Sequence, residues 1–92
     1  MKAVRLTITG RVQGVGYRDW AIRTARTLDL RGWVRNRRDG SVEALVAGDE
    51  AAVSAMIEAC RRGPVSARVD GVDVQSAEVA DVPDGFTYRP TA

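Results

Sequence analysis

The first apolar residues of the chain alternate with polar ones. Val4, Leu6 and Ile8 are separated by single arginine and threonine residues, and this period of two is typical of a β-strand with one buried face. A glycine-rich stretch then interrupts the pattern, and from Tyr17 the apolar positions follow the spacing of one helical face. We therefore expect a strand at the start of the chain and a helix from Tyr17 to about Asp29.

Residues 31–47 have the pattern of a β-hairpin. Residues 31–37 (RGWVRNR) and 41–47 are both predicted to be strands, and the Asp39-Gly40 pair between them is a strong turn signal. A tight turn of this kind joins strands that are neighbours in the sheet. We therefore predict two adjacent antiparallel strands.

A second helix is predicted after the hairpin. Asp49 is a suitable N-cap residue, and four apolar residues then follow at the spacing i, i+3, i+4 and i+7, which places them on one core-facing stripe. These residues are Val53, Met56, Ile57 and Cys60. A glycine followed by a proline, Gly63-Pro64, is expected to end the helix. Cys60 belongs to the stripe and is expected to fill the core rather than to act as a reactive thiol.

The rest of the chain supplies one long strand and one short one. Residues 65–79 alternate again, with a bulge expected near Gly71, and residues 86–89 are predicted to add a short final strand. The order strand, helix, strand, strand, helix, strand predicts an α+β, ferredoxin-like βαββαβ sandwich, with two helices on one face of an antiparallel sheet. We expect the strand order 4-1-3-2, and a single domain over residues 1–92, because a second core would leave neither half enough buried area.

Composition excludes several kinds of chemistry. The chain has no histidine and one cysteine, so an internal disulfide, the usual zinc sites and a Ser-His or Cys-His nucleophile are unavailable. We expect no metal and no cofactor. No stretch is apolar enough to cross a membrane, and the first residues lack the apolar run of a signal peptide. The expected location is therefore the cytoplasm, without membrane association.

Charge is distributed unevenly along the chain. Residues 1–38 carry a net charge of +8 and residues 39–92 a net charge of −6, and thirteen of the fourteen cations are arginine. The planar donor fork of arginine suits phosphate, so the first half of the chain favours an anionic ligand. An ordinary solvated surface explains many of these charges equally well. For Arg11 and Arg35, solvated surface charge is favoured over a role in attracting substrate.

Residues 10–18 (GRVQGVGYR) have the features of an anion-binding loop. Gly14 and Gly16 allow backbone angles that direct several N–H groups to one side, and the predicted helix begins immediately afterwards. Arg18 lies in the first helical turn, from which it can bind a phosphate group bidentately. The run lacks the closing residues of a P-loop and the full dinucleotide fingerprint. On spacing alone, two glycines before a helix more often form only an ordinary tight turn.

Asn36 is the second candidate for a functional residue. It interrupts a predicted strand just before the turn, where an amide has poor β-propensity. A neutral amide donates and accepts hydrogen bonds at once, which suits holding a water molecule. The alternative is that Asn36 only helps to form the turn.

The two segments GRVQGVGYR and GWVRNRRDGSVE closely resemble the two signature segments of the acylphosphatase family. The likeness extends over nearly the whole chain. The resemblance implies a ferredoxin-like fold and hydrolysis of acyl phosphates to carboxylate and orthophosphate without metal. It assigns the catalytic roles to Arg18 and Asn36. It also assigns phosphate binding to the backbone amides of five residues: Gln13, Gly14, Val15, Gly16 and Tyr17.

The chain departs from the family pattern at three positions. Tyr17 stands where phenylalanine is usual, and we expect its extra hydroxyl to reach solvent. Asp29 stands where glycine is common, which concerns how the first helix ends. Met56 replaces a common phenylalanine, a tolerable change in a core. None of these changes affects Arg18 or Asn36.

Two alternatives to an enzyme remain at this stage. Ferredoxin-like sheets also form RNA-binding domains, which stack bases on aromatic residues of the open sheet face. Here Tyr17 and Trp20 lie on the predicted helix, and Trp33, Phe86 and Tyr88 do not form the expected paired motifs. A regulatory domain without activity is the other alternative. We expect a small-molecule acyl phosphate as the partner, no nucleic acid, and a monomer.

Overall fold

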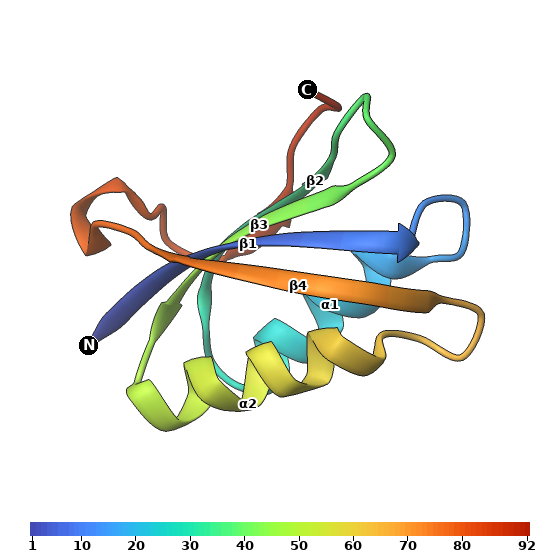
Figure 1. Ribbon diagram of the computed structural model, residues 1–92. Helices are drawn as coiled ribbons and strands as arrows, with labels where there is room; N and C mark the ends of the chain where they lie inside the picture. The colour runs from blue at the N-terminus through green and yellow to red at the C-terminus, as the bar shows by residue number, and fades with distance from the viewer.

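A five-stranded sheet forms one layer of the protein, and two helices cover one of its faces, in a computed structural model that describes residues 1–92 (Figure 1). The strands are β1 (Lys2–Arg11), β2 (Arg31–Asn36), β3 (Val42–Gly48), β4 (Arg68–Ser76) and β5 (Phe86–Tyr88). The helices are α1 (Tyr17–Thr27) and α2 (Glu50–Arg62), with a short 3₁₀ turn, η1 (Val79–Asp81). Neither long helix has the length and apolar character that crossing a membrane requires.

The strand order is β4-β1-β3-β2-β5, which confirms the predicted order of the first four strands. The predicted final strand exists, but it pairs parallel to β2, so the sheet is mixed and the prediction of a wholly antiparallel sheet is wrong at this edge. The reason is the end of the sheet at which β4 finishes. β4 ends at the same end of the sheet at which β2 begins, and the connection to β5 crosses the sheet there without running back along it.

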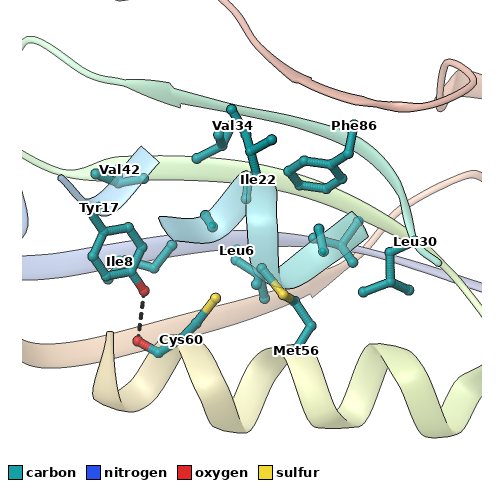
Figure 2. Packing of buried hydrophobic residues seen from close by; sticks show 14 of the residues in the cluster. Leu6, Ile8, Tyr17, Ile22, Leu30, Val34, Val42, Met56, Cys60 and Phe86 are labelled. Atoms are coloured by element: carbon teal, nitrogen blue, oxygen red, sulfur yellow. Dashed lines mark hydrogen bonds between the residues drawn. The ribbon is translucent and has the colours of Figure 1, made fainter. Parts of the chain in front are cut away.

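The pleat of the strands separates two chemically different faces. Val4, Leu6 and Ile8 are buried against the helices, as their alternation predicts. On β2 the same rule places Val34 in this core, and Asn36, two residues later, belongs to the same face of the sheet. Figure 2 shows the core from close by, with side chains from the sheet and both helices meeting in one cluster.

The sheet face away from the helices carries an ion-pair network beside a small apolar cluster that includes Val82 from the connection between β4 and β5. The Glu43 side chain is only 4% exposed and accepts hydrogen bonds from Nη1 of Arg5 and Nε of Arg35, each at 2.7 Å. Burial alone would raise the pKa of Glu43, but the two guanidinium groups outweigh it and hold that pKa below its usual value. Both guanidinium groups also lie over the ring of Trp33. The guanidinium of Arg35 is therefore engaged on this face by Glu43 and Trp33.

The boundaries of β4 differ from the sequence prediction. Residues 65–79 were expected to be one strand, yet the strand covers Arg68–Ser76 and Val65 is fully exposed in the turn before it. The bulge lies beside Gly71, as expected. Thr9 pairs with Gly71 and the next residue of β1 pairs with Val69, so Asp70 is the extra residue.

The helices begin and end near the predicted residues, and two details differ from the expectation. α1 ends at Thr27, and Asp29 then adopts a left-handed backbone (φ 58°), a conformation that explains why glycine suits this position. Asp49 occupies the N-cap position of α2, but its side chain makes no capping hydrogen bond. Gly63 ends α2 with a positive φ of 66°, as its place before Pro64 predicts.

The Tyr17 hydroxyl is buried, so the expectation that it reaches solvent is wrong. The residue is 2% exposed, and its hydroxyl donates a 2.7 Å hydrogen bond to the backbone carbonyl of Cys60 (Figure 2). In a helix this carbonyl would accept from residue 64, which is proline and has no N–H. Burial raises the pKa of Tyr17 far above its usual value. The Tyr17 hydroxyl therefore gives the Cys60 carbonyl a donor that the helix cannot supply. The same bond joins the start of α1 to the end of α2.

Cys60 is a core residue, as predicted. Its side chain is buried among the apolar residues beneath the sheet. Burial raises the pKa of its thiol to about 11, so almost no thiolate forms near neutral pH.

Replacing Tyr17 with phenylalanine should lower the free energy of unfolding by about 1–3 kcal/mol, because the Cys60 carbonyl loses its donor while remaining buried. The measurement is urea unfolding followed by circular dichroism. Tyr88→Phe is the matched control, since that hydroxyl belongs to an exposed side chain; its effect should stay within about 0.5 kcal/mol. Equal stability of the two variants would contradict the role assigned to the buried bond.

Candidate active site

A cavity of about 260 Å³ lies where the glycine-rich loop, the start of α1 and the end of β2 meet. Its lining consists of Val12, Gly14, Gly16, Tyr17, Arg18, Asp19, Asn36 and Tyr88. The fold therefore brings Arg18 and Asn36, from separate predicted segments, to one cavity. No group of three or more cysteine, aspartate or glutamate side chains is placed to hold a metal ion.

The loop before α1 has the backbone that its glycines predict. Gly14 and Gly16 have φ angles of 73° and 79°, in the left-handed region. A Cβ at either position would meet no atom within 4 Å, so the backbone angle, and not lack of space, makes glycine suitable there. Gly16 is the N-cap residue of α1, and no side chain caps the helix. The amides of the first turn are thus free of side-chain partners beside the cavity.

Three of the five predicted phosphate-binding residues line the cavity, namely Gly14, Gly16 and Tyr17, whereas Gln13 and Val15 do not. The Gln13 side chain has a different task. Its amide nitrogen donates to the backbone carbonyls of Arg37 and Ser41, at 2.7 and 2.8 Å. This contact fastens the loop to the β2–β3 hairpin. Sequence patterns give no sign of it, because the acceptors are backbone carbonyls that any residue would supply.

Asn36 ends β2, where its backbone is held from two sides. It pairs with Val42 of β3, and its carbonyl accepts a 3.0 Å hydrogen bond from the Ala92 amide. The turn that follows is stabilised by another residue. Asp39 Oδ1 accepts from the Ser41 amide at 2.9 Å and from its hydroxyl at 2.6 Å, and these bonds lower the pKa of Asp39. The side-chain amide of Asn36 is therefore not needed to form the turn.

Arg18 reaches the cavity from the first turn of α1. Six ion pairs join cationic and acidic side chains of the protein, and Arg18 belongs to none of them. Its guanidinium carbon instead lies 5.6 Å from the centroid of the Tyr88 ring. An unpaired guanidinium at a cavity is available for an anionic ligand. The cavity position of Tyr88 follows from the parallel pairing of β5, which the sequence did not predict.

The other two arginines considered from sequence lie elsewhere. Arg35 lies on the opposite face of the sheet, bound to Glu43. Arg11 is exposed at the end of β1 and does not line the cavity. The exposure of Arg11 agrees with the solvated surface charge expected of it, whereas Arg35 has a structural role in the ion pair with Glu43 and not a solvated one.

Comparison with known proteins gives a consistent result. The family model for acylphosphatase matches residues 4–88. An acylphosphatase of Rhodospirillum rubrum is 55% identical, and one of Acidiphilium cryptum is 54% identical, each over 99% of both chains. The crystal structure of acylphosphatase from Bacillus subtilis matches with a TM-score of 0.92 at 35% identity, over 97% of this chain and 99% of that one. With the sandwich of two helices on a five-stranded sheet, these matches show that the chain belongs to the acylphosphatase family.

Proposed function

We propose that residues 1–92 act as one acylphosphatase domain that hydrolyses small acyl phosphates to a carboxylate and orthophosphate without a metal ion. Arg18 and the loop amides bind the phosphoryl group, and Asn36 orients the attacking water. The observation that carries this proposal is the placement of Arg18 and Asn36 on one cavity, with neither side chain used to hold the fold together. Family membership supports the reaction.

The leaving group of this reaction needs no proton from the protein. Hydrolysis breaks the bond between phosphorus and the acyl oxygen and releases a carboxylate, whose conjugate acid has a pKa of about 4. Such a group departs without first being protonated. A general acid is therefore unnecessary, and a site with no histidine is sufficient for this reaction.

The phosphoryl group needs positive charge around it. Its transition state spreads negative charge over three equatorial oxygens. The planar fork of Arg18 and amides of the loop would face these oxygens before the reaction starts, which is electrostatic stabilisation by groups already in place. The amides of Gly14, Gly16 and Tyr17 are the best placed, because these residues line the cavity.

Asn36 would act through position and not through charge. Its amide can accept a hydrogen bond from water and donate one to a phosphoryl oxygen, which holds the water in line with the breaking bond. Water attacks phosphorus directly in this scheme, so no phosphoenzyme forms, and the proton of the water ends on a product oxygen. The Tyr17 hydroxyl is engaged with Cys60 and is not a candidate nucleophile.

An RNA-binding function has little support from the open sheet face. The aromatic residue there, Trp33, is 5% exposed. Three guanidinium groups lie over its ring, those of Arg5, Arg35 and Arg89. A ring covered in this way cannot stack on a base.

Replacing Arg18 with lysine should lower kcat/KM for benzoyl phosphate roughly 100- to 1,000-fold, because a point-charge ammonium does not reproduce the planar fork. The assay follows hydrolysis by the purified protein in the presence of a chelator. Arg23→Lys, at an exposed position of the same helix, is the control and should keep wild-type activity. Near-normal turnover by Arg18→Lys would count against its assigned role.

Replacing Asn36 with alanine should lower kcat for benzoyl phosphate about 100-fold or more, because the attacking water loses its fixed position. Inhibition by orthophosphate should change less than about twofold, since Arg18 and the loop amides remain. Thr87→Ala, an exposed substitution on β5, is the control. If the wild-type protein itself fails to hydrolyse benzoyl phosphate, the proposed function is rejected.

Replacing Gln13 with glutamate should weaken the fastening of the loop to the hairpin, because a carboxylate cannot donate to the carbonyls of Arg37 and Ser41. We expect about 1–3 kcal/mol less stability and lower kcat/KM, measured by urea unfolding and by the benzoyl phosphate assay. Gln75→Glu makes the same chemical change at an exposed position of β4 and should leave both quantities near wild type. Equal behaviour of the two variants would show that the contact is unimportant.

A further inference from the structure

Tyr88 is the only aromatic residue among the large exposed apolar side chains of the protein. Its side chain is 59% exposed, at the end of the short edge strand β5. Isolated exposed apolar residues need no special explanation. Tyr88 differs from the others because it lines the cavity and its ring lies against the guanidinium of Arg18.

The backbone of Tyr88 is fixed relative to the helix that carries Arg18. Tyr88 pairs with Val34 of β2, and the Arg89 amide donates a 2.9 Å hydrogen bond to the Val34 carbonyl. Two residues earlier, Nε and Nη2 of Arg26 in α1 donate to the Phe86 carbonyl at 3.2 and 3.0 Å. β5 is thus joined to β2 and to α1 at once. The ring of Tyr88 is presented from a rigid support despite its exposure.

A guanidinium that must bind phosphate needs a particular kind of support. Arginine has a long, flexible side chain, and ordering it costs entropy when the ligand binds. A carboxylate would order it, but would occupy the N–H groups and compete with the anion. An aromatic face attracts the guanidinium through its π-electrons and leaves the N–H groups in the guanidinium plane free. Arg18 has such a face in Tyr88 and no carboxylate partner.

We propose that Tyr88 is a positioning residue for Arg18, holding the guanidinium ready for the phosphoryl group through contact with its ring. This inference rests on the proposed role of Arg18 in phosphate binding. It assigns the function to the ring and not to the hydroxyl. Phenylalanine should therefore replace Tyr88, whereas leucine, which is apolar without a π-face, should not.

The experiment compares Tyr88→Leu and Tyr88→Phe by three measurements. Tyr88→Leu should weaken orthophosphate binding in calorimetry about three- to tenfold and lower kcat/KM for benzoyl phosphate by a similar factor. In ¹⁵N NMR, the Arg18 Nε–H should become more mobile on the fast timescale in Tyr88→Leu. Tyr88→Phe should match wild type in all three. Thermal unfolding should be nearly unchanged in both variants, because the side chain is largely exposed.

A double-mutant cycle separates positioning of Arg18 from other effects of the ring. In an Arg18→Ala background, Tyr88→Leu should cause no further loss of orthophosphate binding. An equal loss in both backgrounds would mean that Tyr88 acts without Arg18 and would overturn the inference. Orthophosphate binding and Arg18 mobility unaffected by Tyr88→Leu would also overturn it.

The inference and the proposed function can fail separately. A wild-type protein that binds orthophosphate but does not hydrolyse benzoyl phosphate would reject the function, while the binding and mobility measurements would still decide the role of Tyr88. Wild-type hydrolysis that Tyr88→Leu leaves unchanged, with unchanged orthophosphate binding, would reject the inference and keep the function.

Discussion

The register of β2 is the constraint on which both faces of the protein depend. Val34 must enter the core, and the pleat then places Asn36 on the helix side and Trp33 on the other. Gly32 fixes this register. A Cβ at that position would lie 1.7 Å from the Leu45 carbonyl oxygen, so no other residue fits there. A slip of one position would bury Arg35 in the core and remove Asn36 from the cavity.

The same register builds the ion-pair network on the outer face, beside the apolar cluster that Val82 completes. Glu43 of β3 pairs with Arg35 of β2 across the sheet, and Arg5 of β1 reaches it from the other side. The two guanidinium groups satisfy the buried carboxylate and at the same time cover Trp33. A buried charge is tolerable only when it is paired in this way.

The sequence predicted the parts of the fold that follow from local pattern. Alternation along β1, the helical stripe with Met56 and Cys60, and the Asp39-Gly40 turn all correspond to observed elements. The parallel pairing of β5 was not predicted, because it depends on where β4 ends relative to β2. The burial of the Tyr17 hydroxyl also escaped prediction, because its acceptor is a carbonyl left unpaired by a proline that is distant in sequence.

The candidate site likewise contains residues that the sequence predicted and residues that it did not. Residue type and spacing made Arg18, Asn36 and the glycines candidates, and the resemblance of their two segments to the acylphosphatase signatures assigned their roles. Gln13 contacts only backbone carbonyls, and Tyr88 reaches the cavity through an edge pairing. Neither contact can be inferred from residue type or spacing in the sequence. Long-range contacts of this kind position the functional groups, and a single sequence carries little information about them.

The guanidinium groups of this protein have two different kinds of surroundings, which suit different roles. Arg5 and Arg35 have both a carboxylate and an aromatic ring, so their donors are occupied and their role is structural. Arg18 has an aromatic ring alone, which orders the group and leaves its N–H donors free. The absence of an acidic partner matters here because Arg18 also lines the cavity. Of the thirteen arginines, seven form no ion pair, and Arg18 is the one of these that lines the cavity.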